Sequence, residues 1–149
     1  MIQMTTSPKA WWEKLARGAH LDELTRRECL ELLGAKHVGR LAYNGPNGPR
    51  VVPMNYVVTD LSLIFRTDPE REPGRYSRAR MVAFEVDEID EFFHGGWSVL
   101  VTGLAEPVTV EELRALTIEE TPDPWPEGLR DLFLQIPLAD LSGRRVLPS

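Results

Sequence analysis

The stretch RVVPMNYVVTDLSLIFRT, residues 50 to 67, decides the fold that this sequence predicts. Two runs rich in β-branched and aromatic residues, 50–58 and 61–66, are separated by only two residues. We therefore expect them to pair as an antiparallel hairpin. The second run ends in Arg66-Thr67, so the hairpin delivers a guanidinium and a hydroxyl to the end of a strand.

A basic segment follows this hairpin directly. Residues 66–80 hold five arginines: Arg66, Arg71, Arg75, Arg78 and Arg80. Residues 85–91, by contrast, hold five acidic residues and no basic one. An anionic ligand should therefore meet the first segment and avoid the second. The alternative for residues 66–80 is a solvated loop with local ion pairs. The alternative for residues 85–91 is a solvated strand edge.

Length and composition limit the class of protein. The chain has 149 residues, 42% hydrophobic and 27% charged, as expected for one soluble domain. A net charge of −6 argues against a nucleic-acid surface. No apolar run is long enough to span a bilayer, and the single cysteine, Cys29, allows no intramolecular disulfide. We therefore expect a cytoplasmic protein that binds neither membrane nor nucleic acid.

Six runs along the chain predict strands, and the order of elements predicts a mainly β fold. The expected strands are 38–43, 50–58, 61–66, 81–86, 97–107 and 131–137. Successive antiparallel strands with few helices favour a closed or partly closed barrel, because closure removes open edges. Gly103 lies inside the longest run, where a glycine indicates a bend of the kind that barrels need.

Helices are expected on either side of these strands. The expected helices are 8–17, 25–34 and 109–120, with one helical turn at 76–80. The second and third each begin with a capping box, formed by Thr25 with Glu28 and by Thr109 with Glu112. Residues 68–75 and 87–96 are expected to be loops, the latter acidic and closed by two glycines.

The motif search favours ligand binding over hydrolysis. The chain has no glycine-rich nucleotide loop and no Gly-x-Ser-x-Gly elbow. A phosphate must then be held by side chains, and arginine binds it bidentately. Arg66 and Thr67, with Arg71 or Arg75 on the next loop, meet that need. Trp97 offers a flat wall for an aromatic ring, although core packing would explain a lone tryptophan equally well.

These pieces together resemble the pyridoxamine 5′-phosphate oxidase-like flavoproteins, the split-barrel FMN-binding superfamily, and in particular its small actinobacterial-type members. The resemblance covers roughly residues 24–147. It rests on the order and spacing of LTRRECLELLGAKHVGRLAY, RVVPMNY, IFRT, VAFEVDEID, GWSVLVTGLAEPV and IPLADLSGRRV. It implies FMN, a six-stranded antiparallel Greek-key split barrel with flanking helices, and a homodimer with two sites at the subunit interface. Residues 1–149 then form one domain, with 1–23 as an N-terminal helical extension.

The resemblance also implies which residues hold the cofactor. The strand that lies along the isoalloxazine ring and ribityl chain corresponds to residues 50–55. Arg66 and Thr67 correspond to the pair near the phosphate, which Arg75, or next Arg71, would complete. Trp97 and Ser98 match a strand that approaches the flavin from the second subunit. The full set of implied cofactor-binding residues is Arg50, Val52, Pro53, Met54, Asn55, Arg66, Thr67, Arg71, Arg75, Trp97 and Ser98.

The function implied is an FMN-dependent oxidoreductase that passes electrons to a small acceptor such as a nitro-aromatic compound or a quinone. The alternatives are a non-catalytic protein that holds flavin, a deazaflavin or haem, and a dimeric interaction module with a dead pocket. The chain has Asn55 where the oxidase itself has a lysine, and EREPGRYS replaces the usual Gly-Thr-Lys-Leu-like phosphate segment. We therefore expect a relative of the oxidase without its own activity. No metal site and no catalytic residue is predicted.

Overall fold

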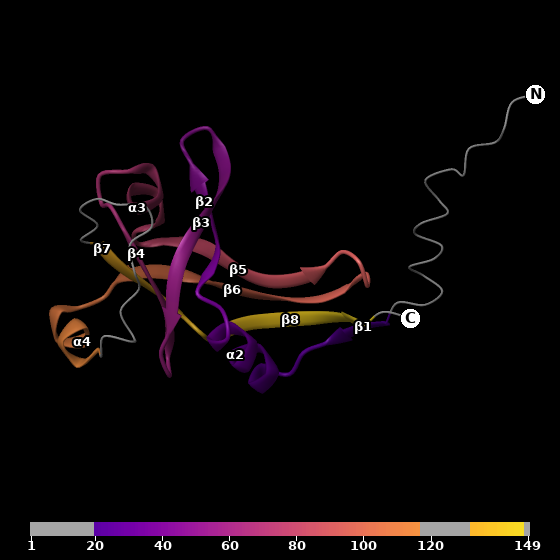
Figure 1. The fold of residues 1–149 in the computed structure, drawn as a ribbon. Coiled ribbons are helices and arrows are strands. Elements are labelled where there is room, and N and C mark those ends of the chain that lie inside the picture. Colours follow the sequence, from indigo (N-terminus) through magenta and orange to yellow (C-terminus); the bar gives the residue numbers. More distant parts are fainter. Residues whose placement is uncertain (1–19, 117–131, 148–149) are drawn as a thin grey trace, which may run out of the picture.

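Six antiparallel strands close into a barrel in the computed structural model, which describes residues 20–116 and 132–147 (Figure 1). The barrel strands are β2 (Val38–Gly45), β3 (Gly48–Val58), β4 (Ser62–Thr67), β5 (Arg80–Asp90), β6 (Gly95–Pro107) and β7 (Leu132–Pro137). Two further strands, β8 (Asp140–Leu147) and β1 (His20–Glu23), extend the sheet beyond β6. The order is β1-β8-β6-β5-β2-β3-β4-β7, and a β6–β7 pairing closes the ring. The predicted mainly β split barrel is confirmed.

Strand β6 closes the barrel because it changes partner along its length. Its first part, from Gly96 to Thr102, pairs with β8, whereas Glu106 and Pro107 pair with β7. Gly103 lies between these two pairings, and a Cβ there would come within 3.0 Å of the Ile136 side chain on β7. A glycine therefore lets β6 approach β7 closely at the turn from one sheet to the other.

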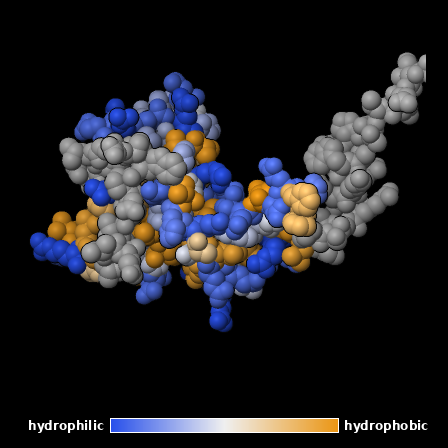
Figure 2. Space-filling view, in the orientation of Figure 1, coloured by the Kyte–Doolittle hydropathy of each residue, from blue (hydrophilic) through white to orange (hydrophobic). Residues whose placement is uncertain are grey.

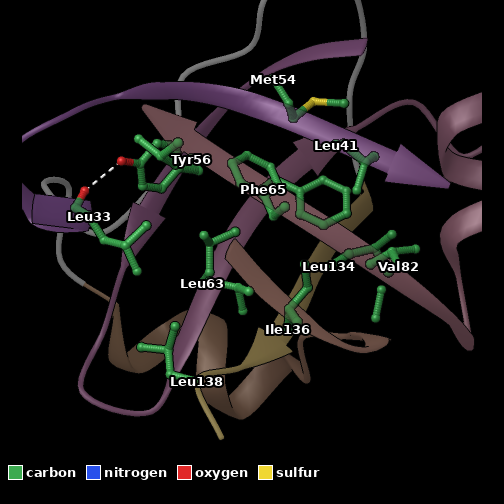
Figure 3. Packing of buried hydrophobic residues seen from close by; sticks show 14 of the residues in the cluster. Leu33, Leu41, Met54, Tyr56, Leu63, Phe65, Val82, Leu134, Ile136 and Leu138 are labelled. Atoms are coloured by element: carbon green, nitrogen blue, oxygen red, sulfur yellow. Dashed lines mark hydrogen bonds between the residues drawn. The ribbon is translucent and has the colours of Figure 1, made fainter. Parts of the chain in front are cut away.

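The barrel interior is filled by alternate residues of its strands, as the two-residue period of a strand requires. Phe65 and Phe84 lie at its centre with their ring centroids 6.0 Å apart, and Tyr56 meets Phe84 edge-on at 5.3 Å. Figure 3 shows Leu41, Leu63, Leu134 and Ile136 packed around these rings. The core therefore comes from strands on all sides of the barrel.

Three helices lie outside the barrel in the described part of the chain: α2 (Arg26–Gly34), α3 (Glu72–Ser77) and α4 (Val110–Ala115). Both predicted capping boxes are present, at Thr25 with Glu28 and at Thr109 with Glu112. Helix α2 buries Cys29 and Leu33 against the barrel. The described part contains no helix of sufficient length and apolarity to cross a bilayer.

Several boundaries differ from the sequence-based predictions. The acidic loop predicted at 87–96 is wrong at both ends, because β5 continues to Asp90 and β6 begins at Gly95. Only residues 91–94 form the turn. Acidic residues fit there because Glu88 and Asp90 are exposed and Asp87 pairs with Arg40. Helix α3 replaces much of the loop expected at 68–75, since Pro73 suits the first turn of a helix.

The chain ends also differ. Residues 20–23 form strand β1 rather than part of a helical extension, and β8 was missed altogether. The helix expected at 8–17 and the end of that expected at 109–120 lie outside the described residues.

The phenol of Tyr56 ties helix α2 to the barrel. Its hydroxyl donates to the carbonyl oxygen of Leu33 at 2.5 Å, and the ring is almost fully buried (Figure 3). Tyr56→Phe should lower the free energy of unfolding by about 1–2 kcal/mol, because the Leu33 carbonyl near the helix end loses this donor. Chemical denaturation measures the change. Tyr76→Phe is the control, because the Tyr76 hydroxyl makes no hydrogen bond with the described residues. An equal loss of stability in the two variants would contradict this role of Tyr56.

A charged cluster on the outer face of the barrel predicts a pH dependence of stability. Arg40 Nη1 lies 3.1 Å from a Glu85 oxygen and 3.0 Å from an Asp87 oxygen. Burial, aided by Asp87 and opposed by Arg40, raises the pKa of Glu85 from 4.5 to about 7. Folding therefore favours protonated Glu85, and the free energy of unfolding should fall as pH rises from about 4.5 to about 7.

Glu85→Gln should flatten this part of the stability profile, as measured by denaturation at a series of pH values. Glu88→Gln on the same strand is the matched control, since Glu88 is more exposed and pairs with Lys36 at 3.1 Å. A slope that survives in Glu85→Gln would contradict the assignment.

Candidate functional site

Two buried hydroxyl groups without a hydrogen-bond partner lie at the ends of β4 and α3. The side chains of Thr67, at the last position of β4, and Ser77, at the last position of α3, are both fully buried. Neither Thr67 Oγ1 nor Ser77 Oγ makes a hydrogen bond. Unsatisfied buried hydroxyls cost free energy, and they are rare unless something else satisfies them. A polar ligand could satisfy them only if the residues that now cover these hydroxyls moved aside.

Helix α3 packs tightly against the segment that leaves β4. A Cβ at Gly74 would come within 2.3 Å of the carbonyl oxygen of Asp68, so only glycine fits there. The amide of Arg71 also donates to that carbonyl, at 3.3 Å. These contacts hold the helix back against the strand end. Hydrophilic residues cover the β2–β3 turn at this end of the molecule (Figure 2).

The predicted phosphate-binding arginines differ in how far they are already engaged. The Arg66 guanidinium lies over the Phe133 ring, 5.2 Å from its centroid, and Arg71 Nε lies 3.7 Å from Asp68. Arg75 is exposed on α3 and makes no ion pair with any described residue. Of the three, Arg75 has the least competition for an incoming anion.

Glu72 places a negative charge in the first turn of α3. Its Oε1 accepts a hydrogen bond from the Tyr43 hydroxyl at 2.8 Å and lies 3.5 Å from Arg50 Nε. Burial, with the Glu72 hydrogen bond second, raises the pKa of Tyr43 to about 12. The carboxylate therefore ties α3 to β2 and β3, and it partly neutralises Arg50.

The predicted ring-binding strand presents its residues alternately to two faces. Met54 is buried and Val52 half-buried on the barrel side. Pro53 is exposed and Asn55 half-buried on the other side. A ligand lying along the outside of β3 would therefore meet Pro53 and Asn55 rather than the other two side chains.

Trp97 and Ser98 lie at the opposite end of the molecule from α3. They stand near the start of β6, and Figure 1 shows the β5–β6 turn far from α3. Their register partners on β5 are Glu88 and Asp87. Trp97 packs against the hydrophobic core, so its side chain and that of Ser98 lie on opposite faces of β6. A single chain thus does not bring them to the α3 end. Two surface hollows, of about 450 Å³ and 730 Å³, share Ser98 and Arg144 in their linings.

Sequence reasoning did not assign Ser77, Glu72 or Arg144 to a site. Ser77 sits in the segment 76–80, which was expected to form one helical turn, and only the fold reveals that it is buried at the end of α3. The doublet Arg144-Arg145 was visible in the sequence, but β8 was not expected there. No group of acidic, histidine or cysteine side chains with metal-binding geometry occurs in residues 20–116 and 132–147.

Comparison with known proteins places this chain in a family. The sequence profile of the family described as Pyridoxamine 5′-phosphate oxidase matches residues 25–145. An uncharacterized protein of Mycobacterium tuberculosis H37Rv, Rv0080, is 30% identical over 130 residues, which cover 84% of this chain and 85% of that protein.

Two solved structures share the fold over most of both chains. An FAD-binding protein of Mesorhizobium loti is 29% identical with a TM-score of 0.70, covering 87% of this chain and 99% of that one. The FAD-binding protein of Mycobacterium smegmatis is 25% identical with a TM-score of 0.66, covering 85% and 98%. The profile match spans most of the sequence, and the barrel topology agrees with it; the chain belongs to the pyridoxamine 5′-phosphate oxidase family.

Proposed function

We propose that this protein is a homodimeric flavoprotein that binds FMN at the subunit interface and passes electrons to a small-molecule acceptor. One observation carries the proposal: Thr67 and Ser77 are buried hydroxyls without partners at the end of β4 and in α3. A phosphate offers several strong acceptor oxygens, and in this proposal it accepts hydrogen bonds from both hydroxyls once the residues that cover them move aside. The similarity to two solved FAD-binding proteins supports a flavin as the bearer of that phosphate.

In this proposal the α3 end holds the phosphate. Thr67 and Ser77 donate hydrogen bonds, and Arg75 supplies a charge that no described residue neutralises. Arg66 contributes from the neighbouring position on β4, and Arg71 is the second choice after Arg75 because Asp68 already pairs with it. The Glu72 carboxylate repels a bound phosphate and so offsets part of the attraction by the arginines. The two hydroxyls therefore contribute a larger share of the phosphate affinity.

The ring would lie along β3, past Asn55 and Pro53, and would be walled by Trp97 and Ser98 of a second subunit. The flavin supplies the redox chemistry when bound, and the side chains of this chain orient the ring and limit the access of water. FMN is the expected form. FAD is the alternative, because the two similar solved structures are of FAD-binding proteins.

The outer face of the barrel supports the dimer. Met81 on β5 and Leu104 on β6 are direct register partners, and both side chains are exposed. Val51 on β3 and Leu100 on β6 add exposed apolar surface to the same outer face. Contiguous exposed apolar surface on a soluble protein marks an interaction site. A two-fold dimer would cover this face in both subunits at once.

Thr67→Val and Ser77→Ala test the phosphate assignment without disturbing the fold. Each replaces an unsatisfied hydroxyl with an apolar group of similar or smaller size, so stability without ligand should stay equal or rise. FMN affinity should fall about tenfold or more for each substitution, because a hydrogen bond to a charged group is lost. Arg75→Gln should weaken FMN binding comparably, whereas the exposed Arg27→Gln on α2 should not.

Isothermal titration with FMN and with riboflavin measures these effects. The wild-type protein should bind FMN more tightly than riboflavin, and the ratio of the two affinities should be smaller in the variants. Equal affinity for the two flavins, or a double hydroxyl variant that binds FMN like wild type, would contradict the phosphate site. A Soret band in the purified protein would instead indicate the haem alternative.

Met81→Glu should convert the dimer to monomer and reduce flavin binding, because it places a charge in the proposed apolar interface. Sedimentation velocity at micromolar concentrations measures the association state. Leu61→Glu is the matched control: Leu61 is 80% exposed at the β3–β4 turn and away from the proposed interface, so its variant should remain dimeric. A wild-type protein that sediments as a monomer would overturn the dimer.

A further inference from the structure

A hollow of about 450 Å³ lies beside the β5–β6 turn, and none of the proposed phosphate-binding residues lines it. Its apolar lining includes three register neighbours on adjacent strands: Ile89 on β5, Gly96 on β6 and Val146 on β8. Ser98 and Arg144, which are register partners two residues further along, line the hollow on one side. The hollow is therefore apolar in one part and polar in another.

The glycine is required by the fold and keeps the space between Ile89 and Val146 open. Gly96 has φ +153°, and a Cβ there would lie 2.4 Å from the carbonyl oxygen of Glu88. No larger residue therefore fits at this position without a shift of the backbone. The side chains of Ile89 and Val146 flank a bare stretch of backbone, which suits the flat face of a ring.

Arg144 is a cation without an ion pair in the described part of the chain. Its neighbour Arg145, which faces the other side of β8, lies 3.6 Å from Glu28. Several carboxylates lie near the hollow. Asp87, the register partner of Ser98, already pairs with Arg40 at 3.0 Å. Asp90 already accepts hydrogen bonds from the amides of Phe92 and Phe93 at 3.0 and 3.1 Å, and Glu23 and Glu91 are exposed.

We propose that this hollow binds a flat apolar anion, with its ring over Gly96 between Ile89 and Val146 and its acidic group paired with Arg144. A volume of about 450 Å³ lies within the range of small-molecule pockets. The inference deepens the proposed function and rests on it in one respect. Trp97 and Ser98, the proposed flavin wall, also line the hollow, so the ligand would lie next to the flavin as the small-molecule substrate.

Titration with 2-naphthoate, a flat apolar carboxylate, tests the hollow, with neutral 2-naphthalenemethanol as the matched ligand. Calorimetry on the full chain, both flavin-free and FMN-saturated, gives the affinities. Arg144→Gln should weaken 2-naphthoate binding about tenfold or more and leave the neutral alcohol unchanged, because only the carboxylate uses the guanidinium. Arg145→Gln should affect neither ligand. Ile89→Ser should weaken both, since it removes one wall of the hollow.

The outcomes separate this inference from the proposed function. Arg144-dependent binding of 2-naphthoate to a protein that does not bind FMN would support the hollow and refute the flavin. If the protein binds FMN but not 2-naphthoate, the proposed ligand site in the hollow is refuted and the flavin site is not. The same holds if Arg144→Gln leaves the affinity for 2-naphthoate unchanged. Displacement of 2-naphthoate by FMN would also overturn the inference, because the hollow would then belong to the flavin ring.

Discussion

Barrel closure depends on β6, a 13-residue strand that pairs with β5, β8 and β7. Gly103 lies where it passes from β8 to β7, and a side chain there would press on Ile136. Helix α3 packs against Asp68, the residue after β4, and the side chains of Thr67 and Ser77 at the ends of these two elements are buried. Strand β6 carries Trp97 and Ser98 to the other end of the molecule. The two parts of the proposed site therefore lie at opposite ends of one chain.

That separation gives the proposed dimer its physical reason. A ring bound near α3 of one chain cannot be walled by Trp97 of the same chain, because the two lie at opposite ends of the barrel (Figure 1). A second copy can supply that wall if the outer faces pack together. The exposed pair Met81 and Leu104 would then be buried, while the Arg40–Glu85–Asp87 cluster would place charged groups near the same face.

The sequence predicted the fold better than the site. The helix ends at Thr25 and Thr109 were predictable because capping boxes are local, and the hairpin over 50–67 was predictable from its period. Strand β8 was not, since glycine and arginines occupy a run whose partner is distant in sequence. The outward acidic residues of β5 were mistaken for a loop because only the partner strand supplies Arg40. Likewise, the burial of Ser77 and the pairing of Arg50 with Glu72 depend on tertiary contacts, which no local sequence pattern predicts.

The account reduces to one physical claim: a phosphate satisfies hydroxyls that the fold buries at one end of each chain, and the second chain completes the site around the attached ring. Native mass spectrometry of the purified, unmodified protein tests this claim most directly, because it reports chains and bound small molecules in one spectrum. The account predicts a species of two chains with two flavin nucleotides. A single chain that retains a flavin, or a dimer that remains empty when flavin is supplied in excess, would contradict it.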